Sequence, residues 1–500
     1  PMQSSRVTDA HLGWATVTFA LICALCSSGC ATHSQRLVAP RHAFYSNDLT
    51  AAQNELSKLS AKRGGDEHVV ELDLAIVDLL QGNAKGAEQR LRQVRDQFDH
   101  LEQKSVAEAT VSMMTDDQRR AYSGEDYEKL LIRVFLSLAS LMQDGVDAES
   151  YALQALSKYE QLRTDAQTRW GDNAVAAYQV PPIAPYLRGV ISEASMHNYD
   201  DALRGYQQAA ELLPEHSFLL ADVERAAHGV HSPPGHGVVY VIALVGRGPY
   251  KIEAEAPATQ EALLIADRIV SAVGKYSVPP TLAPIKIPEV ISPTKPFDVV
   301  GVEVNGRPVS TTLPITDVHK LASETFAAKR SELMARTVAR RVIKKGAVVA
   351  AKDQLDVNSS LTSLAFDAAG VLWEATESAD TRCWGLLPRE IQVLRLQLPA
   401  GQYLLNLEPV SGGRPLATGT PCTVGVVDGT ALPIIRIVPS VEFYDYEAKY
   451  NRDDTRYEVN PALPAGVVGE VQAAAESLAR AIGVRHLCRV DFLLDGDARP

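Results

Sequence analysis

Apolar residues recur at helical spacing through most of the first half of the chain. From residue 48 to residue 227, apolar side chains fall three and four positions apart, which is the pattern of helices that bury one face. Two such runs flank Gly82-Asn83, a dipeptide that favours a tight turn. The pattern therefore predicts an antiparallel helix pair around that turn and further helices in the rest of the segment.

One run in this segment has a more specific spacing. Ala202, Tyr206, Ala209 and Pro214 follow the small-aromatic-small-proline order of the second helix of a tetratricopeptide repeat. Small residues let neighbouring helices approach, and the proline ends the unit. We expect a tetratricopeptide-like helical domain over residues 48–227, with an unrelated helical domain as the alternative. Such repeats stabilise by stacking on one another, and their surface is a possible site for a protein partner.

Strand patterns begin after a segment rich in glycine and proline. Val238–Val245 is a run of β-branched and other apolar residues, which predicts a buried strand. Val299–Val304 predicts another strand, and Asn305-Gly306 directly after it is a strong signal for a two-residue hairpin turn.

A long helix is predicted between these strands and the next ones, roughly from Asp317 to Lys352. Most of its cations lie on the side opposite the apolar residues: Arg330, Arg336, Arg340, Arg341, Lys344 and Lys345. This basic face either lies on anionic lipid or is solvated, and the solvated face is the expectation. Beyond the helix, Ile391–Leu398 and Tyr403–Leu407 flank a turn and predict a β-meander. Residues 238–410 are thus expected to form a central mixed α/β domain.

The last part of the chain has its own order of elements. Thr423–Val438 predicts a hairpin, and residues 464–482 predict a helix. In the strand that follows, alternation places Arg489 and Asp491 on one face, so that a cation and a carboxylate are presented together. The fold class expected for the whole chain is multidomain α+β, because helical and strand-rich regions succeed one another.

Composition narrows the functional classes. A chain of 500 residues, 46% hydrophobic and 22% charged, is large enough for several cores. Its formal net charge of −12, without a basic stripe carrying aromatics, argues against a nucleic-acid partner. Three of the six cysteines lie within the first thirty residues, and Cys383, Cys422 and Cys488 are isolated in the sequence. No disulfide framework or CxxC metal site is therefore expected.

The N-terminus has the pattern of an export signal. The apolar run Trp14–Cys26 is too short for a permanent membrane span, and small residues precede Cys30. Residues 1–29 are therefore expected to be a lipoprotein signal peptide, with Cys30 as the lipidated N-terminus and the anchor to the membrane. An ordinary secretory signal with a coincidental cysteine is the alternative. Lipidation implies a cell-envelope location, on the outer or cytoplasmic membrane and facing the periplasm.

Residues 1 to about 410 resemble a family of uncharacterised bacterial lipoproteins with tetratricopeptide-like repeats. Three segments carry the resemblance: Tyr122–Arg133, the helix that contains Glu324–Lys345, and Asp380–Tyr403. The resemblance supports localisation and architecture but supplies no reaction. The same region contains no nucleophile elbow, Walker loop or paired metal motif in its sequence.

Residues 423–500 resemble the C-terminal part of the ATP-grasp domain of D-alanine:D-alanine ligases. The resemblance rests on Phe443–Tyr450 and the strand with Arg489 and Asp491. It implies that Arg489 neutralises charge on the tetrahedral intermediate, that Asp491 holds Mg²⁺, and that Lys449 and Tyr450 lie on a mobile lid. ATP, Mg²⁺ and D-alanine are the implied cofactors and substrate if the ligase is complete, and by itself this segment implies a cytoplasmic location.

That implied site lacks several parts in this sequence. The family brings a Glu-x-Asn pair on the next strand, whereas this sequence ends at Pro500. No counterpart of the nucleotide-gripping residues precedes the hairpin, so the cofactor-binding residues are unknown. The chain by itself is therefore expected to need no cofactor, and whether it is an enzyme is left open.

Residues 411–422 are expected to be a junction between two different kinds of protein. One hypothesis is a lipid-anchored, non-catalytic scaffold or binding module fused to an incomplete ligase fragment. The alternative is a D-alanine:D-alanine ligase of peptidoglycan precursor synthesis whose N-terminal half is lost or misjoined.

Overall fold

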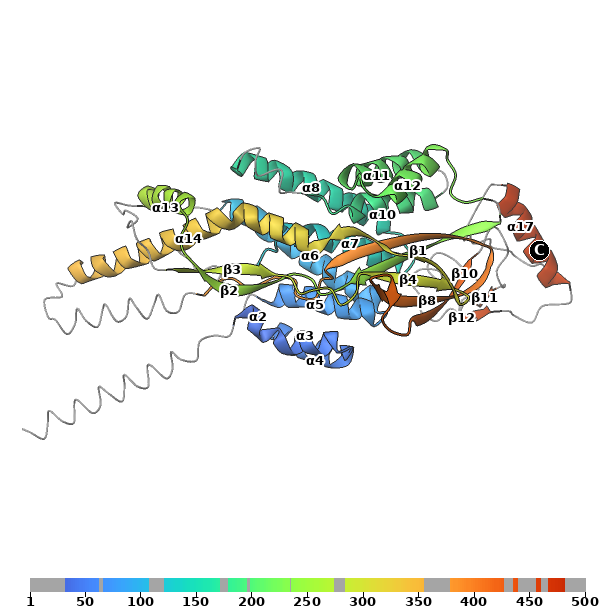
Figure 1. Cartoon of the computed structure of the whole chain (residues 1–500), viewed down its shortest axis with the longest axis horizontal. Coiled ribbons are helices and arrows are strands. Elements are labelled where there is room, and N and C mark those ends of the chain that lie inside the picture. The colour runs from blue at the N-terminus through green and yellow to red at the C-terminus, as the bar shows by residue number, and fades with distance from the viewer. Residues whose placement is uncertain are drawn as a thin grey trace, which may run out of the picture. The chain divides into compact units, whose positions relative to one another are not determined.

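A computed structural model gives the fold, in which helices and sheets are mixed (Figure 1). The structure describes residues 32–62, 66–107, 121–170, 179–195, 198–233, 235–273, 284–354, 378–426, 435–438, 456–459 and 466–481. The chain divides into two compact units, each assembled from three stretches of sequence. Unit 1 comprises Pro1–Pro181, Gly246–Thr294 and Asp317–Arg389, and unit 2 comprises Pro182–Val245, Lys295–Thr316 and Glu390–Pro500.

Unit 1 begins with a stack of helices in which each helix packs on the next along the chain (Figure 1). The helices are α2 (His33–Arg36), α3 (Val38–Tyr45), α4 (Leu49–Ser60), α5 (Glu67–Leu80), α6 (Ala84–Ala107), α7 (Asp126–Leu141) and α8 (Ala148–Trp170). The helix pair predicted around Gly82-Asn83 is confirmed as α5 and α6, and Gly82 has the positive φ of 78° that the turn needs. None of the helices in the described ranges is both long and apolar enough to span a bilayer.

Unit 1 also contains a two-stranded sheet covered by two helices. Strand β2 (Tyr250–Ala256) pairs antiparallel with β3 (Ile285–Ile291), while α13 (Gln260–Val273) and α14 (Val318–Gln354) pack against them. The long helix predicted from Asp317 is α14. Its residues Met334, Val338 and Val342 are buried in the cluster with α13 and the sheet. This part of the apolar face is therefore occupied within the protein.

An extended segment, residues 378–389, runs through the interior of unit 1. Cys383, Trp384 and Leu387 each have an exposed fraction of 0%, and the Trp384 ring packs against Phe135 at a centroid distance of 5.3 Å. A buried segment outside helices and sheets must find partners for its backbone N–H groups. The Leu386 N–H donates to Asp73 Oδ1 at 2.8 Å. The segment therefore completes a core whose helices come from the beginning of the chain.

The described part of unit 2 contains three consecutive helices, several sheets and a further helix near its C-terminal end. The helices α10 (Ile183–Ala194), α11 (Tyr199–Leu212) and α12 (Ser217–Ala227) pack consecutively. One sheet has the order β1-β7-β6, from β1 (His236–Val245), β7 (Glu390–Pro399) and β6 (Leu313–Asp317). A second sheet has the order β10-β8-β4-β5, from β10 (Thr420–Val426), β8 (Gly401–Ser411), β4 (Val299–Val304) and β5 (Arg307–Thr311), with β9 (Arg414–Pro415) paired to β8.

The predicted β-meander of β7 and β8 is wrong in its pairing. The two strands lie in different sheets, and β7 pairs antiparallel with β1. Leu396 of β7 and Leu405 of β8 instead meet across the core, together with Val302 of β4. Each strand has apolar residues at alternate positions. The two sheets bury these positions against one another, so β7 and β8 need not pair in one sheet. The hairpin predicted at Asn305-Gly306 is confirmed between β4 and β5.

The hairpin predicted for Thr423–Val438 is also wrong. Its first half forms β10 and pairs with β8, where Thr423 lies opposite Leu404. Its second half, β11 (Ile435–Val438), pairs with β12 (Arg456–Val459) in a separate sheet. Pro421 is accommodated because β10 is an edge strand, where a missing N–H is tolerated. The helix predicted over residues 464–482 is confirmed as α17 (Val467–Ala481).

The close approach of α10 and α11 generates a first prediction. A Cβ added at Gly205 would lie 2.7 Å from the Pro185 carbonyl oxygen, which belongs to the backbone and cannot move aside cheaply. Gly205→Ala should lower the free energy of unfolding by about 1–3 kcal/mol because the helices must separate. Urea denaturation of the full chain measures this change. The control is Gly469→Ala in α17, where an added Cβ meets nothing within 4 Å and should not destabilise. Equal stability of the two variants would contradict the packing argument.

Burial of Asp73 generates a second prediction. Desolvation raises the pKa of Asp73 to about 7, although Arg41 and the backbone N–H groups of residues 385 and 386 oppose the shift. The folded state therefore keeps a proton that the unfolded chain releases near pH 4. Stability from this group is fully present below that pH and is lost as pH rises toward 7, by up to about 1.4 kcal/mol per pH unit.

The measurement compares the free energies of unfolding of the wild type and of Asp73→Asn between pH 5 and pH 8. Asparagine does not titrate, so the wild type should lose stability relative to the variant as pH rises. A difference between the two proteins that stays constant across this range would contradict the role of Asp73.

Candidate functional site

The five site residues predicted from sequence lie outside the described residues. These are Cys30, Lys449, Tyr450, Arg489 and Asp491. Their roles in lipidation, catalysis and magnesium binding therefore stay predictions. In the segment from Thr423 onward, the structure describes the end of β10, the pair β11–β12 and helix α17.

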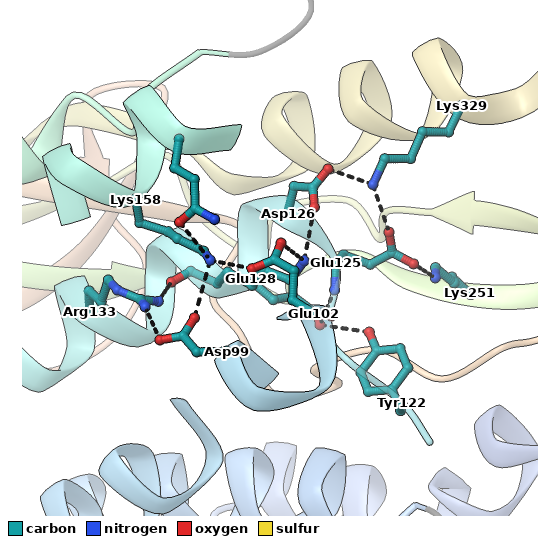
Figure 2. A network of polar contacts seen from close by, with 12 residues as sticks. Asp99, Glu102, Tyr122, Glu125, Asp126, Glu128, Arg133, Lys158, Lys251 and Lys329 are labelled. Atoms are coloured by element: carbon teal, nitrogen blue, oxygen red, sulfur yellow. Dashed lines mark hydrogen bonds and ion pairs between the residues drawn. The ribbon is translucent and has the colours of Figure 1, made fainter. Parts of the chain in front are cut away.

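Among the described residues, a dense network of buried and half-buried charges lies in unit 1 (Figure 2). It joins α6, α7, α8, β2 and α14. Five carboxylates and five cations belong to it: Asp99, Glu102, Glu125, Asp126, Glu128, Lys129, Arg133, Lys158, Lys251 and Lys329. Figure 2 shows the carboxylates and cations pointing toward one another from these different elements.

Glu128 lies at the centre of the first part of this network, with an exposed fraction of 0%. It forms a capping box with Glu125 at the start of α7, in which its Oε2 accepts the Glu125 N–H at 3.0 Å. The same oxygen accepts the Tyr122 hydroxyl at 2.6 Å, and Oε1 accepts the Trp384 N–H at 2.7 Å. Burial and the neighbouring Glu125 raise the pKa of Glu128, while these donors oppose the rise.

Two lysines from distant parts of the chain meet the start of α7. Lys251 of β2 is hydrogen-bonded to Glu125, and Lys329 Nζ of α14 lies 2.6 Å from Asp126 Oδ2. Burial by itself would lower the pKa of Lys251, but Glu125 outweighs it and the pKa is raised. Burial would likewise raise the pKa of Glu125, yet the two lysines hold it below its usual value. Both partners are therefore charged, and their attraction fixes β2 and α14 to the N-terminus of α7.

The other end of the network joins α6, α7 and α8. Lys129 Nζ lies 3.0 Å from Glu102 Oε1, and Lys158 contacts the other oxygen of the same carboxylate. Arg133 Nη2 donates to Asp99 Oδ2 at 2.6 Å. Burial would raise the pKa of Asp99, but Arg133 and Lys158 lower it overall. Breaking one such buried pair would leave a charge without compensation, which costs several kcal/mol.

This arrangement resembles a structural network more than a reaction centre. Each of its carboxylates faces cations or hydrogen-bond donors of the protein itself. Within the described ranges, no group of three or more His, Cys, Asp or Glu side chains is placed to hold a metal ion.

A second buried cluster crosses the helices of unit 2. Glu193 of α10 has an exposed fraction of 0% and accepts two hydrogen bonds from Arg225 of α12, at 2.7 and 2.8 Å. The Tyr206 hydroxyl of α11 donates to the same carboxylate. This paired fork geometry is strong and directional. One carboxylate thus ties together α10, α11 and α12.

Sequence reasoning missed both clusters, although a signal existed for part of the first. Glu125 and Glu128 have capping-box spacing, and Asp126, Lys129 and Arg133 lie three and four residues apart on one helical face. These spacings indicate a charged helix start. The partners Lys251 and Lys329 come from segments more than 120 residues away, and no local pattern links them to α7.

Comparison with known proteins identifies a relationship for the C-terminal segment. Residues 416–499 match the family model described as D-ala D-ala ligase C-terminus. A D-alanine--D-alanine ligase of Dechloromonas aromatica (strain RCB) is 49% identical over 77 residues, which are 15% of this chain and 26% of the relative. One of Anaeromyxobacter sp. (strain K) is 46% identical over 82 residues, 16% of this chain and 27% of the relative.

A third relative is D-alanine--D-alanine ligase B of Chromobacterium violaceum, 47% identical over 77 residues, which are 15% of this chain and 24% of the relative. The chain therefore spans about a quarter of the length of the curated relatives it matches. No solved structure matches the chain. The C-terminal part of the chain is similar to the C-terminal domain of D-alanine:D-alanine ligases.

Proposed function

We propose that the chain is a lipid-anchored protein of the bacterial cell envelope, in which the helical region serves as a non-catalytic scaffold and the C-terminal segment is an incomplete ligase domain. The anchor is Cys30, behind the signal pattern of residues 1–29. The protein faces the periplasm from the outer or cytoplasmic membrane.

The observation that carries this proposal is an exposed apolar surface on unit 1. Leu141, Met142, Val146 and Leu153 at the α7–α8 turn and along α8 are 40–79% exposed. Next to them is a shallow hollow lined by Val146, Glu149, Ser150, Leu153, Gln154 and Ser157. Apolar residues grouped on a surface commonly mark a protein contact. Helical hairpins of a tetratricopeptide-like type offer such surfaces, and a partner protein on the helices is part of the proposal.

A D-alanine:D-alanine ligase is the second candidate, and the family match at residues 416–499 favours it. In this interpretation Arg489, Lys449 and Tyr450 act on the reacting groups, Asp491 binds Mg²⁺, and the substrates are D-alanine and ATP. The family match covers residues 416–499, and about a quarter of the length of the ligase relatives is matched. A ligase that grips ATP needs residues from both lobes of its domain.

Lipidation generates a third prediction. Cells that express the chain in the presence of radiolabelled palmitate should yield labelled protein in the membrane fraction, because the acylated cysteine is the anchor. Cys30→Ser should abolish the label. Cys422→Ser is the matched control, since Cys422 lies exposed on β10 and should leave the label unchanged. Label that persists in Cys30→Ser would contradict the proposed anchor.

Catalysis generates a fourth prediction. The purified full chain with ATP, Mg²⁺ and D-alanine should release no phosphate above background, because the chain matches only about a quarter of the ligase relatives. Asp491→Asn and Arg489→Ala should behave in the same way. Phosphate release that requires D-alanine and disappears in both variants would overturn the scaffold proposal in favour of the ligase.

A further inference from the structure

The first described residues after Cys30 are fixed firmly to unit 1. Thr32 caps α2 and forms a reciprocal capping box with Gln35. His33 and Ser34 are 4% and 7% exposed, and the Ser34 N–H donates to Thr381 Oγ1 at 3.2 Å. His33 Nδ1 also lies 3.4 Å from Asp66 Oδ2. The folded structure therefore includes the chain from Thr32 onward, two residues beyond Cys30.

This short separation limits how far the fold can lie from an acylated Cys30. Two residues span at most about 7 Å even when fully extended. The acyl chains of a lipidated cysteine enter the hydrocarbon layer, so the cysteine itself lies among the headgroups, in a layer about 5–8 Å thick on each side. Thr32 is thus confined to the headgroup layer or its immediate edge.

The surface next to Thr32 has the chemistry for such a position. The exposed positions Gln35, Val38, Ala39 and His42 are spaced three and four residues apart along α2 and α3, which share a single intervening residue. Val38 is 62% exposed although it is apolar. An apolar residue between polar ones suits the boundary between headgroups and water.

Charge favours the same surface. The chain as a whole carries a net charge of −12, yet residues 31–47 contain no Asp or Glu. Arg36, Arg41 and two histidines lie in this stretch, and the Arg36 side chain is 42% exposed beside its partner Asp66. Anionic lipid repels the acidic parts of a protein surface, so such a protein approaches the lipid with a part of its surface that has few carboxylates. The face formed by α2 and α3 is such a place.

We infer that unit 1 docks directly on the membrane, with the exposed face of α2 and α3 (Gln35, Val38, Ala39 and His42) lying against anionic phospholipid headgroups rather than at the end of a flexible tether. This inference rests on the proposed lipidation of Cys30. The helices further along the stack, of which α8 is the last, then face away from the bilayer and present their exposed apolar residues to other proteins.

The test uses the full lipidated chain in vesicles of phosphatidylethanolamine and phosphatidylglycerol. Cys422→Ser and Cys488→Ser remove two thiols, while Cys383 stays because it is 0% exposed and burial raises its pKa to about 12. A fluorophore is attached to a new cysteine, either Val38→Cys or Val146→Cys. Both positions carry an exposed valine, at 62% and 79%, and Val146 precedes α8 on the other side of the helix stack from α3 (Figure 1).

On vesicles, iodide in the water should quench the probe at position 38 several-fold less than the probe at position 146, and spin-labelled headgroups should quench it more. In a chain that begins at Ala31, which has no acylated cysteine and stays in solution, iodide should quench both probes alike. Insertion of ten Gly and Ser residues between Ala31 and Thr32 adds up to about 33 Å of reach and should restore iodide quenching at position 38.

The outcomes separate this inference from the proposed function. A chain that incorporates no palmitate refutes the anchor, and the docking with it. An acylated, vesicle-bound chain whose two probes are quenched equally by iodide leaves the anchor standing but overturns the docking. Protection at position 38 that survives the insertion refutes the short connection as its cause.

Discussion

The structure of unit 1 depends on burying an extended stretch of backbone, residues 378–389, without leaving its N–H groups unsatisfied. An amide that loses water and finds no partner costs several kcal/mol. Most carbonyl groups inside a helix already accept a hydrogen bond from their own helix. The acceptors are instead side-chain carboxylates, Asp73 for Leu386 and Glu128 for Trp384.

Burying a charged carboxylate in turn costs free energy, because the charge loses its water. The core of unit 1 lowers this cost in two different ways. Asp73 keeps a proton up to neutral pH, as its raised pKa shows. Near Glu128, at the start of α7, Glu125 forms an ion pair with Lys251 and Asp126 forms one with Lys329. Through Glu128, the network of unit 1 thus connects the irregular segment to the start of α7, which is paired with β2 and α14.

Local patterns in the sequence were sufficient for some elements and not for others. Periodicity and turn residues predicted the α5–α6 pair, the helices α11, α14 and α17, and the β4–β5 hairpin, because each depends on neighbours in sequence. The partners of β7 and β10 were mispredicted. The apolar face of a strand can be buried with several different strands as neighbours, and segments far away in the sequence determine which strand it pairs with. The burial of residues 378–389 and the lysines of the network are likewise non-local. The ligase segment was recognised because its residues resemble a family.

The contact between Glu128 and Trp384 joins residues 256 positions apart in sequence. At synthesis rates of 5–20 residues per second, the ribosome needs roughly 10–50 s to make the intervening chain. During that interval Phe135 and Glu128 lack the partner that they contact in the folded chain. A polypeptide with this topology depends during its synthesis on a holding chaperone or a secretion apparatus. Either one keeps the chain unfolded until the segment that contains Trp384 has been made.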